Sequence, residues 1–379
     1  MKNRAKGLLS LWLTGHLLAC SVLPSAALSQ TDFDEKYAAT QAHLSTLPAQ
    51  VGSVGGEWLV IGLTRADAYS DEQKAAYEKA AAKYVRAVGS DRLHPRKSSD
   101  NARMILALSA IGRDARDVDG YDLTEPLNDS TYVAKQGING VIWALIALDA
   151  CDYPCRQGTR EALLDKLLQA RHTDGGWGLD AVSDPDVTGM AVQALAPYRF
   201  YDEKIQAALD RACELLASMQ QESGGYLSYD DFNPESCAQV ITALSCLGVD
   251  VQQDERFCKD GKTPFDSLLR FSVPDGFAHS LGGSYNQMAT EQAFYAMTAY
   301  RRMQTAKTPL FEMSDVQSFA VADIDGDGHV TINDATTVQR FLAEYDESLS
   351  APLQKLADLS RSGRVDISDV TLLQRQLAE

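Results

Sequence analysis

The chain has 379 residues and a formal net charge of −17, and 45% of its residues are hydrophobic. This length allows two or three domains with sizeable cores, and the hydrophobic content excludes an intrinsically disordered protein. The excess of acidic residues argues against nucleic acid and anionic membranes as partners, because both would repel it.

The amino terminus has the pattern of an export signal. Three basic residues precede an apolar run over residues 8–23, which is too short for a good membrane span, so no transmembrane segment is expected. Ala27-Leu28-Ser29 matches a signal-peptidase site, and we expect residues 1–29 to be removed and the protein to be secreted. An alternative is attachment as a lipoprotein through Cys20, because residues 17–20 resemble a lipoprotein box.

Residues 30–308 show an internal repeat, in which a glycine-rich turn precedes a capped helix with an Ala-Leu or similar pair. The pairs recur at intervals of 37 to 53 residues, a period typical of stacked supersecondary units. Six such inner helices, alternating with six outer helical stretches, predict an all-α protein built on an α6/α6 toroid. Inner helices are expected around residues 62–63, 107–108, 144–145, 194–195, 243–244 and 296–297, and outer ones over 32–47, 70–88, 121–135, 159–170, 203–219 and 264–271.

The turns of this repeat carry a family resemblance. Gln169…Asp174-Gly-Gly-Trp177-Gly178 and Gln220…Gly224-Gly225-Tyr226 are similar to the repeats of protein prenyltransferase β subunits and squalene cyclases. The resemblance covers roughly residues 32–305. It implies the toroid fold, and it is much less specific for an activity.

The catalytic residues that this resemblance implies are incomplete. The cyclases use Asp-x-Asp-Asp, whereas this chain has Asp184-Pro-Asp186-Val187. Asp186 is interpreted as a helix-start residue, where the helix dipole favours the charged carboxylate over a proton donor. The zinc prenyltransferases use Asp-x-Cys and a distant His; Glu235-x-Cys237 matches the pair loosely, and the His position falls near Ala289. We therefore expect no isoprenoid cyclase or transferase activity.

Candidate cavity residues are found by counting back along the chain from the first residue of each Ala-Leu or similar pair. Positions −8, −4 and −1 share one helical face of mixed polarity, while the neighbouring apolar face is expected to pack on the outer helices. The mixed face is expected to line a central cavity for a glycan or a peptide, unless its polar groups satisfy one another as a structural core. His172 and His279, beside glycine turns, are interpreted as surface turn residues. The candidates are Trp58, Arg103, Trp143, Asp186, Met190, Gln193, Glu235, Gln239, Thr242, Gln292 and Tyr295.

Residues 323–334 have the spacing of a calcium-binding loop. Ca²⁺ takes oxygen ligands from positions 1, 3, 5, 7, 9 and 12, and a glycine at position 6, here Gly328, allows the sharp turn. The expected ligands are the side chains of Asp323, Asp325, Asp327 and Asp334, the carbonyl oxygen of His329, and Thr331 directly or through water.

A second loop follows 35 residues later, over residues 358–369. Serines at positions 3 and 5 replace two carboxylates, and an aspartate at position 9 restores only one. We therefore expect calcium at two sites, the second weaker than the first. The ligand positions of the second loop are Asp358, Ser360, Ser362, Arg364, Asp366 and Asp369.

The two loops, with the helices after them, resemble a type I dockerin over residues 316–379, joined to the toroid by a short linker at 309–315. The resemblance implies a cellulosome component whose dockerin binds a cohesin domain of a scaffoldin in a calcium-dependent way. In dockerins the positions beside the last calcium ligand set the choice of cohesin. Here these positions are Ile332, Asn333, Ile367 and Ser368.

Three functions stay open for the toroid. The first is a non-catalytic module that binds a glycan or a peptide. The second is an enzyme, either an isoprenoid cyclase or a polysaccharide-degrading toroid, which a pair of catalytic carboxylates facing one cleft would favour. The third is a carrier resembling the cobalamin-binding α6/α6 proteins, suggested only by residues 186–191.

Overall fold

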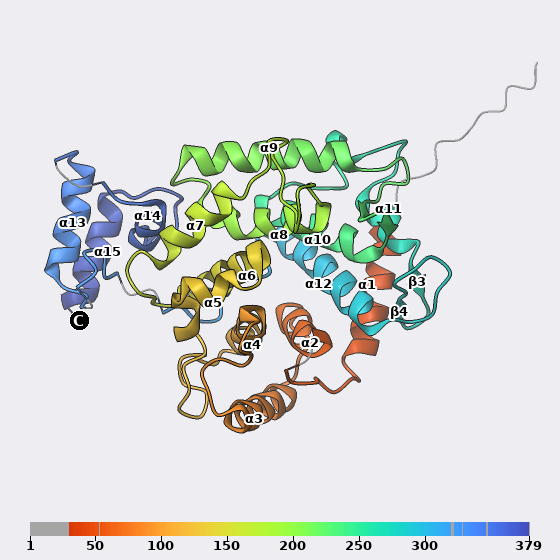
Figure 1. The fold of residues 1–379 in the computed structure, drawn as a ribbon, viewed down its shortest axis with the longest axis horizontal. Helices are drawn as coiled ribbons and strands as arrows, with labels where there is room; N and C mark the ends of the chain where they lie inside the picture. Colours follow the sequence, from red (N-terminus) through yellow and green to blue (C-terminus); the bar gives the residue numbers. More distant parts are fainter. Residues whose placement is uncertain (1–29, 53, 320–321, 328, 346–347, 379) are drawn as a thin grey trace, which may run out of the picture.

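The structure, a computed structural model, describes residues 30–52, 54–319, 322–327, 329–345 and 348–378. The expected signal peptide and Gly328 lie outside the described residues. The chain forms a large helical module and, at one side of it, a small C-terminal module of residues 322–378 (Figure 1). None of the helices in the described part is both long and apolar enough to span a membrane.

The helices predicted from the repeat are confirmed, and the six inner ones contact one another in a closed order. Each inner helix contacts the next one along the chain, and the last, α12, returns to contact the first, α2. The inner helices are α2 Val54–Arg65, α4 Ser98–Ala110, α6 Gly137–Asp149, α8 Pro185–Leu195, α10 Pro234–Leu247 and α12 Gln287–Gln304.

Polar caps and prolines begin two of the inner helices. Asp184 caps α8 and Asn233 caps α10, each accepting hydrogen bonds from backbone N–H groups of the first turn. Pro185 and Pro234 follow directly, at a position where the helix loses no N–H donor. The same local chemistry therefore starts successive inner helices.

The remaining helices of the large module lie at its periphery, where α3 and α9 are the longest (Figure 1). The stretch predicted over residues 121–135 is divided into a 3₁₀-helix and a short α-helix, because Pro126 interrupts it. The outer helices are α1 Gln30–Leu44, α3 Asp71–Val88, α5 Ser130–Ala134, α7 Thr159–Gln169, α9 Glu203–Met219 and α11 Pro264–Leu269; the 3₁₀-helices are η1 Glu125–Asn128, η2 Ala196–Tyr198 and η3 Glu255–Phe257.

Two β-hairpins, which the sequence pattern did not predict, lie in the loops before α10 and α12. Strand β1 (Leu227–Ser228) pairs antiparallel with β2 (Asp231–Phe232), and β3 (Ser272–Val273) pairs with β4 (Gly276–Phe277). Strands of two residues are too short to show an alternating pattern in the sequence.

The glycine-rich turn of the repeat is built around a buried tryptophan. Trp177 is fully buried, and its indole N–H donates a 2.7 Å hydrogen bond to the carbonyl oxygen of Leu167. Gly175 has a φ of 105°, and a Cβ atom at Gly176 would lie 2.4 Å from the side chain of Leu215. Both positions therefore require glycine.

The segment between the two modules is packed against the helical module, where the sequence predicted a short linker. Leu310 and Met313 are fully buried and Phe311 is 6% exposed. The backbone N–H of Met313 also donates a 2.6 Å hydrogen bond to the carbonyl oxygen of Ala150. We call residues 309–319, which lie between the helical module and the C-terminal module, the connector.

The C-terminal module has a small core of its own. Helices α13 (Ile332–Leu342) and α15 (Ile367–Ala378) pack together, and α14 (Ala351–Ala357) lies beside them. Helix α14 joins two cores, because Ala357 belongs to the small core and Ala351 to the core of the helical module.

Candidate functional sites

The first calcium loop brings three carboxylates together. One oxygen atom each of Asp323, Asp325 and Asp327 lie within 4.8 Å of one another. Among the residues that the structure describes, this is the one group of three His, Cys, Asp or Glu side chains with the spacing of metal ligands. Hard, anionic oxygens at this spacing fit Ca²⁺.

The last ligand position closes the first loop onto α13. Asp334 is fully buried, and its carboxylate accepts hydrogen bonds from the backbone N–H groups of Ile324 (2.6 Å) and Thr331 (2.7 Å). Thr331 caps α13 and forms a reciprocal capping box with Asp334. The exposed His329 follows in the same loop and donates its backbone N–H to Asp327.

The second loop closes in the same way around fewer carboxylates. Asp369 accepts 2.8 Å hydrogen bonds from the backbone N–H groups of Ser360 and Asp366, which matches the part played by Asp334. Asp358 is 3% exposed and accepts the backbone N–H of Ser362 at 3.0 Å. The carbonyl oxygen of Arg364, a predicted ligand, accepts the hydroxyl of Ser362 at 2.9 Å.

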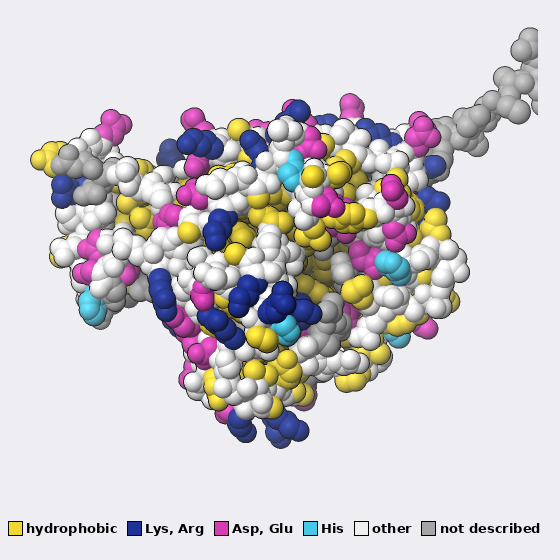
Figure 2. Space-filling model, in the orientation of Figure 1, with side chains coloured by type: hydrophobic (Ala, Val, Ile, Leu, Met, Phe, Trp, Pro, Cys, Tyr) yellow, Lys and Arg dark blue, Asp and Glu magenta, His cyan; other side chains and the backbone are white. Residues whose placement is uncertain are grey.

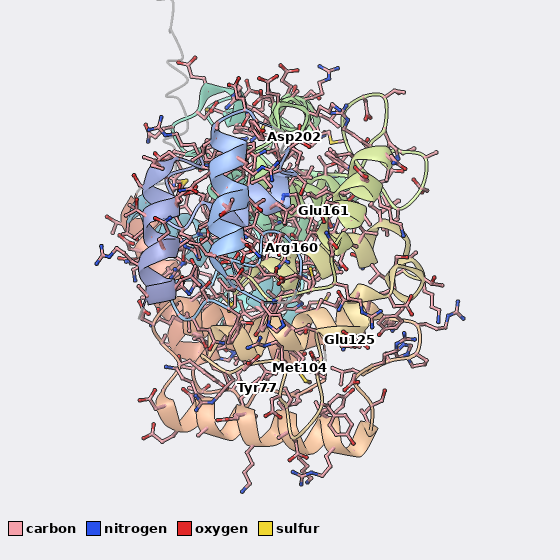
Figure 3. The ribbon with its side chains drawn as sticks, turned by 90° about the vertical axis from the view of Figure 1, so that its left-hand side faces the viewer. Tyr77, Met104, Glu125, Arg160, Glu161 and Asp202 are labelled. Carbon is pink, nitrogen blue, oxygen red and sulfur yellow. The ribbon has the colours of Figure 1, made fainter. Side chains whose placement is uncertain are left out.

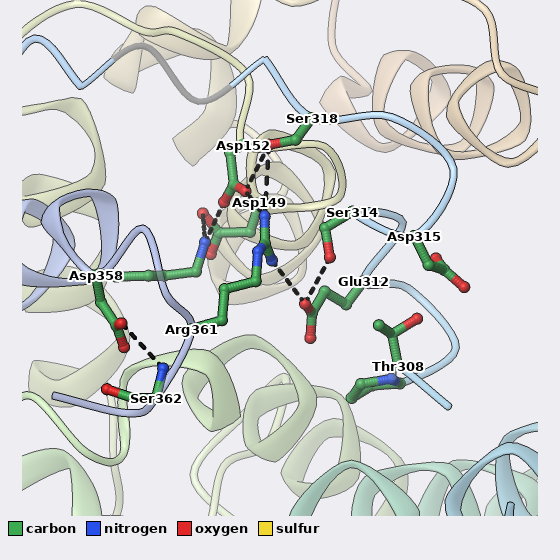
Figure 4. Close-up of polar contacts among 12 residues, drawn as sticks. Asp149, Asp152, Thr308, Glu312, Ser314, Asp315, Ser318, Asp358, Arg361 and Ser362 are labelled. Atoms are coloured by element: carbon green, nitrogen blue, oxygen red, sulfur yellow. Dashed lines mark hydrogen bonds and ion pairs between the residues drawn. The ribbon is translucent and has the colours of Figure 1, made fainter. Parts of the chain in front are cut away.

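Charged pairs hold the second loop against the helical module. The ammonium nitrogen of Lys355 lies 2.5 Å from Asp152, and the guanidinium of Arg361 lies 3.0 Å from Asp152 and 3.0 Å from Glu312 of the connector (Figure 4). Burial raises the pKa of Asp152, but Lys355 and Arg361 outweigh it and hold this pKa well below its ordinary value. We call these four residues the docking cluster.

The surface predicted to recognise a cohesin is exposed in this structure. Figure 3 shows the C-terminal module facing the viewer, with Arg160 and Glu161 of α7 labelled. Glu161 accepts a 2.7 Å hydrogen bond from the hydroxyl of Ser350, just before α14. The predicted recognition residues Ile332 and Ile367 are 59% and 63% exposed. Their neighbours Asn333 and Ser368 are also exposed.

In the helical module, several predicted cavity residues meet in the interior and form hydrogen bonds with one another. The amide of Gln193 donates to Gln239 (3.1 Å), the amide of Gln239 donates to the hydroxyl of Tyr295 (2.7 Å), and that hydroxyl donates to Gln292 (3.2 Å). We call these four residues the amide network. Thr242 is outside it, because its hydroxyl bonds to a carbonyl oxygen of its own helix.

Aromatic rings fill the interior beside the amide network. The ring centroid of Trp58 lies 5.0 Å from that of Trp143 and 5.8 Å from that of Tyr295. Phe311 of the connector inserts among them, 5.7 Å from Trp143. At this depth the predicted cavity is therefore filled by the protein itself.

Asp186 differs from the sequence interpretation. It does not cap α8, because Asp184 does. Its Oδ1 atom is buried without a hydrogen-bond partner. Burial, together with the nearby Asp184 and Glu235, raises the pKa of Asp186 to about 7 against the opposing effect of the Ser236 hydroxyl. The expectation that the helix dipole favours the charged form was wrong, because loss of water outweighs the dipole.

His279 is part of a polar pair that the sequence did not indicate. Its Nδ1 atom lies 3.0 and 3.1 Å from the two carboxylate oxygens of Glu235, and its Nε2 atom lies 3.7 Å from Asp231. The hydrogen bond to Glu235 raises the pKa of His279. His279 comes from the loop before α12 and Glu235 from the start of α10, so two repeats build this pair.

Two further buried acids were also missed. Glu291 of α12 and Glu57 of α2 are at most 1% exposed, and one oxygen of each has no hydrogen-bond partner. Burial raises the pKa of Glu291 to about 8 and that of Glu57 to about 7. Arg103 lies 3.8 Å from Glu57. Each acid stands five residues before the Ala-Leu or similar pair of its repeat. This shared position could have indicated both acids from the sequence.

Exposed apolar side chains gather in the chain just before the helices α8 and α10 and around the start of α12. Seven of the nine exposed large hydrophobic side chains in the described part of the helical module come from the chain before α8 and α10 and around the start of α12. Figure 2 shows this face hollowed near its middle, with Lys and Arg over α4 and α5 and Asp and Glu on the α12 side. We call this hollow the mouth; its apolar rim is Leu179, Val182, Leu227, Tyr229, Leu281, Tyr285 and Met288.

Comparison with known families identifies the small module. Residues 321–378 match the dockerin type I domain, and the match spans both calcium loops and helices α13 to α15. No curated protein shows a significant match to the chain. The match supports calcium-dependent binding to a cohesin and, through it, association with an extracellular cellulosome.

Proposed function

We propose that the protein is a cohesin-docked, extracellular protein whose helical module binds a peptide at the mouth. Residues 30–308 would form an α6/α6 toroid that carries this site, and the dockerin would attach it to a scaffoldin. The closed order of contacts among the six inner helices supports the toroid. The signal peptide expected at residues 1–29 supplies the route of export.

The mouth is the observation that carries this proposal. Its rim exposes seven large apolar side chains, and soluble proteins rarely keep such a patch unless it meets a partner. Beneath the rim lie buried oxygens of Asp186 and Glu291 without hydrogen-bond partners. A bound ligand would cover the apolar rim and supply hydrogen-bond partners for these oxygens.

The chemistry of the rim favours a peptide over a glycan. Five of its seven side chains are aliphatic, and only Tyr229 and Tyr285 are aromatic. Aliphatic groups gain most from burying other apolar groups, whereas the hydroxyls of a sugar would lose water there without gaining partners. Exposed Lys and Arg side chains also lie over α4 and α5, on the side of the hollow opposite the acids (Figure 2). A peptide carries charges of both signs, and a neutral polysaccharide carries none.

A displayed library of random dodecapeptides tests the proposal. Peptides enriched on the calcium-loaded protein should lose at least tenfold in affinity when Tyr229 and Leu281 are both changed to Ser. Val88→Ser, which removes an exposed apolar side chain from the outer helix α3, should leave binding unchanged. If no peptide is enriched, or if only a glycan array shows binding, the proposal fails.

A second candidate is acid–base catalysis on the bound chain, favoured by the arrangement of Asp186 and Glu235. A carboxyl group with a pKa of about 7 is partly protonated at neutral pH and can donate a proton to a leaving group. Glu235, oriented by His279, would accept a proton from the attacking water. Hydrolysis of peptides or polysaccharides by the wild-type protein, lost in Asp186→Asn, would establish this activity; its absence from the wild type would leave binding alone.

A further inference from the structure

We infer that the mouth takes a cationic nitrogen of the bound peptide, an ammonium or guanidinium group, at a layer formed by Asp186, Glu235 and Glu291. The inference rests on the proposed peptide site and specifies which group of the peptide enters deepest. We call these three residues the acidic layer.

The acidic layer lies on the inward face of the helices, one to two turns closer to their N-terminal ends than the amide network. Glu235 stands four residues before Gln239, and Glu291 stands four residues before Tyr295. Residues four apart share one face of a helix, and both network residues point into the interior. Asp186 stands seven residues, about two turns, before Gln193 on the same face of α8.

Two acids of this layer lack a counter-ion. Glu291 is fully buried, and the groups that act on its carboxyl are the amide of Gln287 and the acid Glu57. Asp186 is acted on by the Ser236 hydroxyl and by other acids. Among the described residues, no basic side chain pairs with either carboxyl. A buried carboxylate without a cation is strongly unfavourable, so these carboxyl groups favour their protonated form when the site is empty, and a cationic ligand can replace the proton.

The unpartnered atoms also define the hydrogen-bonding character of the ligand. Within the inner helices they include four buried acceptors, one oxygen each of Glu57, Asp186, Gln193 and Glu291. The unpartnered donors on these helices are Nε of Arg103, which lies 3.8 Å from Glu57, and, at the other end of α2 from Glu57, Nε of Arg65 and the hydroxyl of Thr64. The site therefore calls for donors. An ammonium or guanidinium group offers three to five N–H donors and no acceptor, whereas a carboxylate or phosphate offers the reverse.

The experiment uses the full chain in calcium and the enriched dodecapeptides. We expect Lys, Arg or a free amino terminus at one fixed place in these peptides. Replacing that Lys by norleucine, which keeps the carbon chain and removes the charge, should weaken binding at least tenfold. The double variant Asp186→Asn with Glu291→Gln should bind the two peptides equally, while Asp165→Asn, on the exposed face of α7, should keep the preference.

The outcomes separate this inference from the function on which it rests. If peptides bind at the mouth, and the lysine and norleucine peptides bind the wild type equally, the cationic group is refuted while peptide binding stands. If no peptide binds, both are refuted. The norleucine comparison requires no variant protein, so it decides the question even where the double variant fails to fold.

Discussion

The hydroxyl of Tyr201 donates a 2.8 Å hydrogen bond to Oδ2 of Asp358, the first ligand position of the second calcium loop. The backbone N–H of Gly363 donates to the same oxygen at 2.7 Å. Tyr201 belongs to the helical module and Asp358 to the dockerin. Docking of the two modules and the calcium binding predicted at the second loop would therefore act on one buried carboxylate.

Tyr201→Phe should weaken calcium binding at the second loop. The change removes a hydrogen bond to a charged group, an interaction that contributes about 1.5–3 kcal/mol, so the affinity should fall by roughly ten- to a hundredfold. Calorimetric titration with calcium measures this, with Tyr345→Phe, an exposed tyrosine of the dockerin, as the control. A higher affinity in Tyr201→Phe would show that the tyrosine competes with the metal.

The two loops should differ in their importance for the cohesin. Asp323→Ala removes one of three clustered carboxylates and should abolish most cohesin binding, whereas Asp358→Ala, in the loop with fewer carboxylates, should weaken it less. Titration of each variant with a cohesin, in calcium and in chelator, compares them. Equal calcium affinities at the two loops would contradict this ranking.

Asp152→Asn should open the joint between the modules. The variant leaves the buried ammonium of Lys355 without its closest partner, and breaking a buried pair costs about 3–5 kcal/mol. Because opening the joint returns Lys355 to water, we expect undocking with both modules still folded. Hydrogen exchange in α14 should accelerate and cohesin binding should persist. Unchanged exchange would mean that the docking cluster contributes little.

Stability should fall as the pH rises, and Glu291 should contribute to the slope. Burial raises the pKa of Glu291 from 4.5 to about 8, so between these values the folded state holds a proton that the unfolded state has released. The stabilisation by this proton is complete below the pKa of the unfolded state and is lost as the pH rises through the pKa of the folded state. The free energy of unfolding falls by at most about 1.4 kcal/mol per pH unit. Glu291→Gln should flatten this slope in urea unfolding at pH 5, 7 and 9; Glu214→Gln, on the exposed face of α9, should not.

Phe311→Ala should destabilise the helical module although Phe311 lies outside the repeat. Its ring fills the interior between Trp58 and Trp143, and truncating a buried phenylalanine costs about 3–5 kcal/mol. Thermal unfolding measures the loss, with the exposed Leu179→Ala as the control. A loss as small as that of the control would show that the interior closes without the connector.

Local patterns were sufficient to predict the helices and the first calcium loop. The Ala-Leu pairs fall within all six inner helices, because helical periodicity and capping are properties of neighbouring residues. The dockerin loops are equally local, since one segment of 12 positions supplies every ligand. The amide network was also anticipated as one of two outcomes for the mixed face, because positions on one helical face can be counted from the sequence.

Features that join distant residues could not be predicted in this way. Glu235 and His279 are 44 positions apart, and Tyr201 and Asp358 are 157 apart. The charge state of Asp186 depends on how far neighbouring repeats exclude water, so local helix rules gave the wrong direction. Phe311 follows the last repeat, and its burial depends on rings from α2, α6 and α12.

The buried connector has a consequence for how far the protein can search once it is anchored. A flexible linker of n residues lets a domain explore a distance of about 5–6 Å times the square root of n, and so sets the local concentration of its partners. Here Leu310 and Met313 are fully buried, and Arg361 of the dockerin lies 3.0 Å from Glu312 of the connector. The helical module, with its mouth, then moves with the dockerin as one rigid body. The position of the cohesin along its scaffoldin therefore decides which neighbouring proteins the mouth can contact.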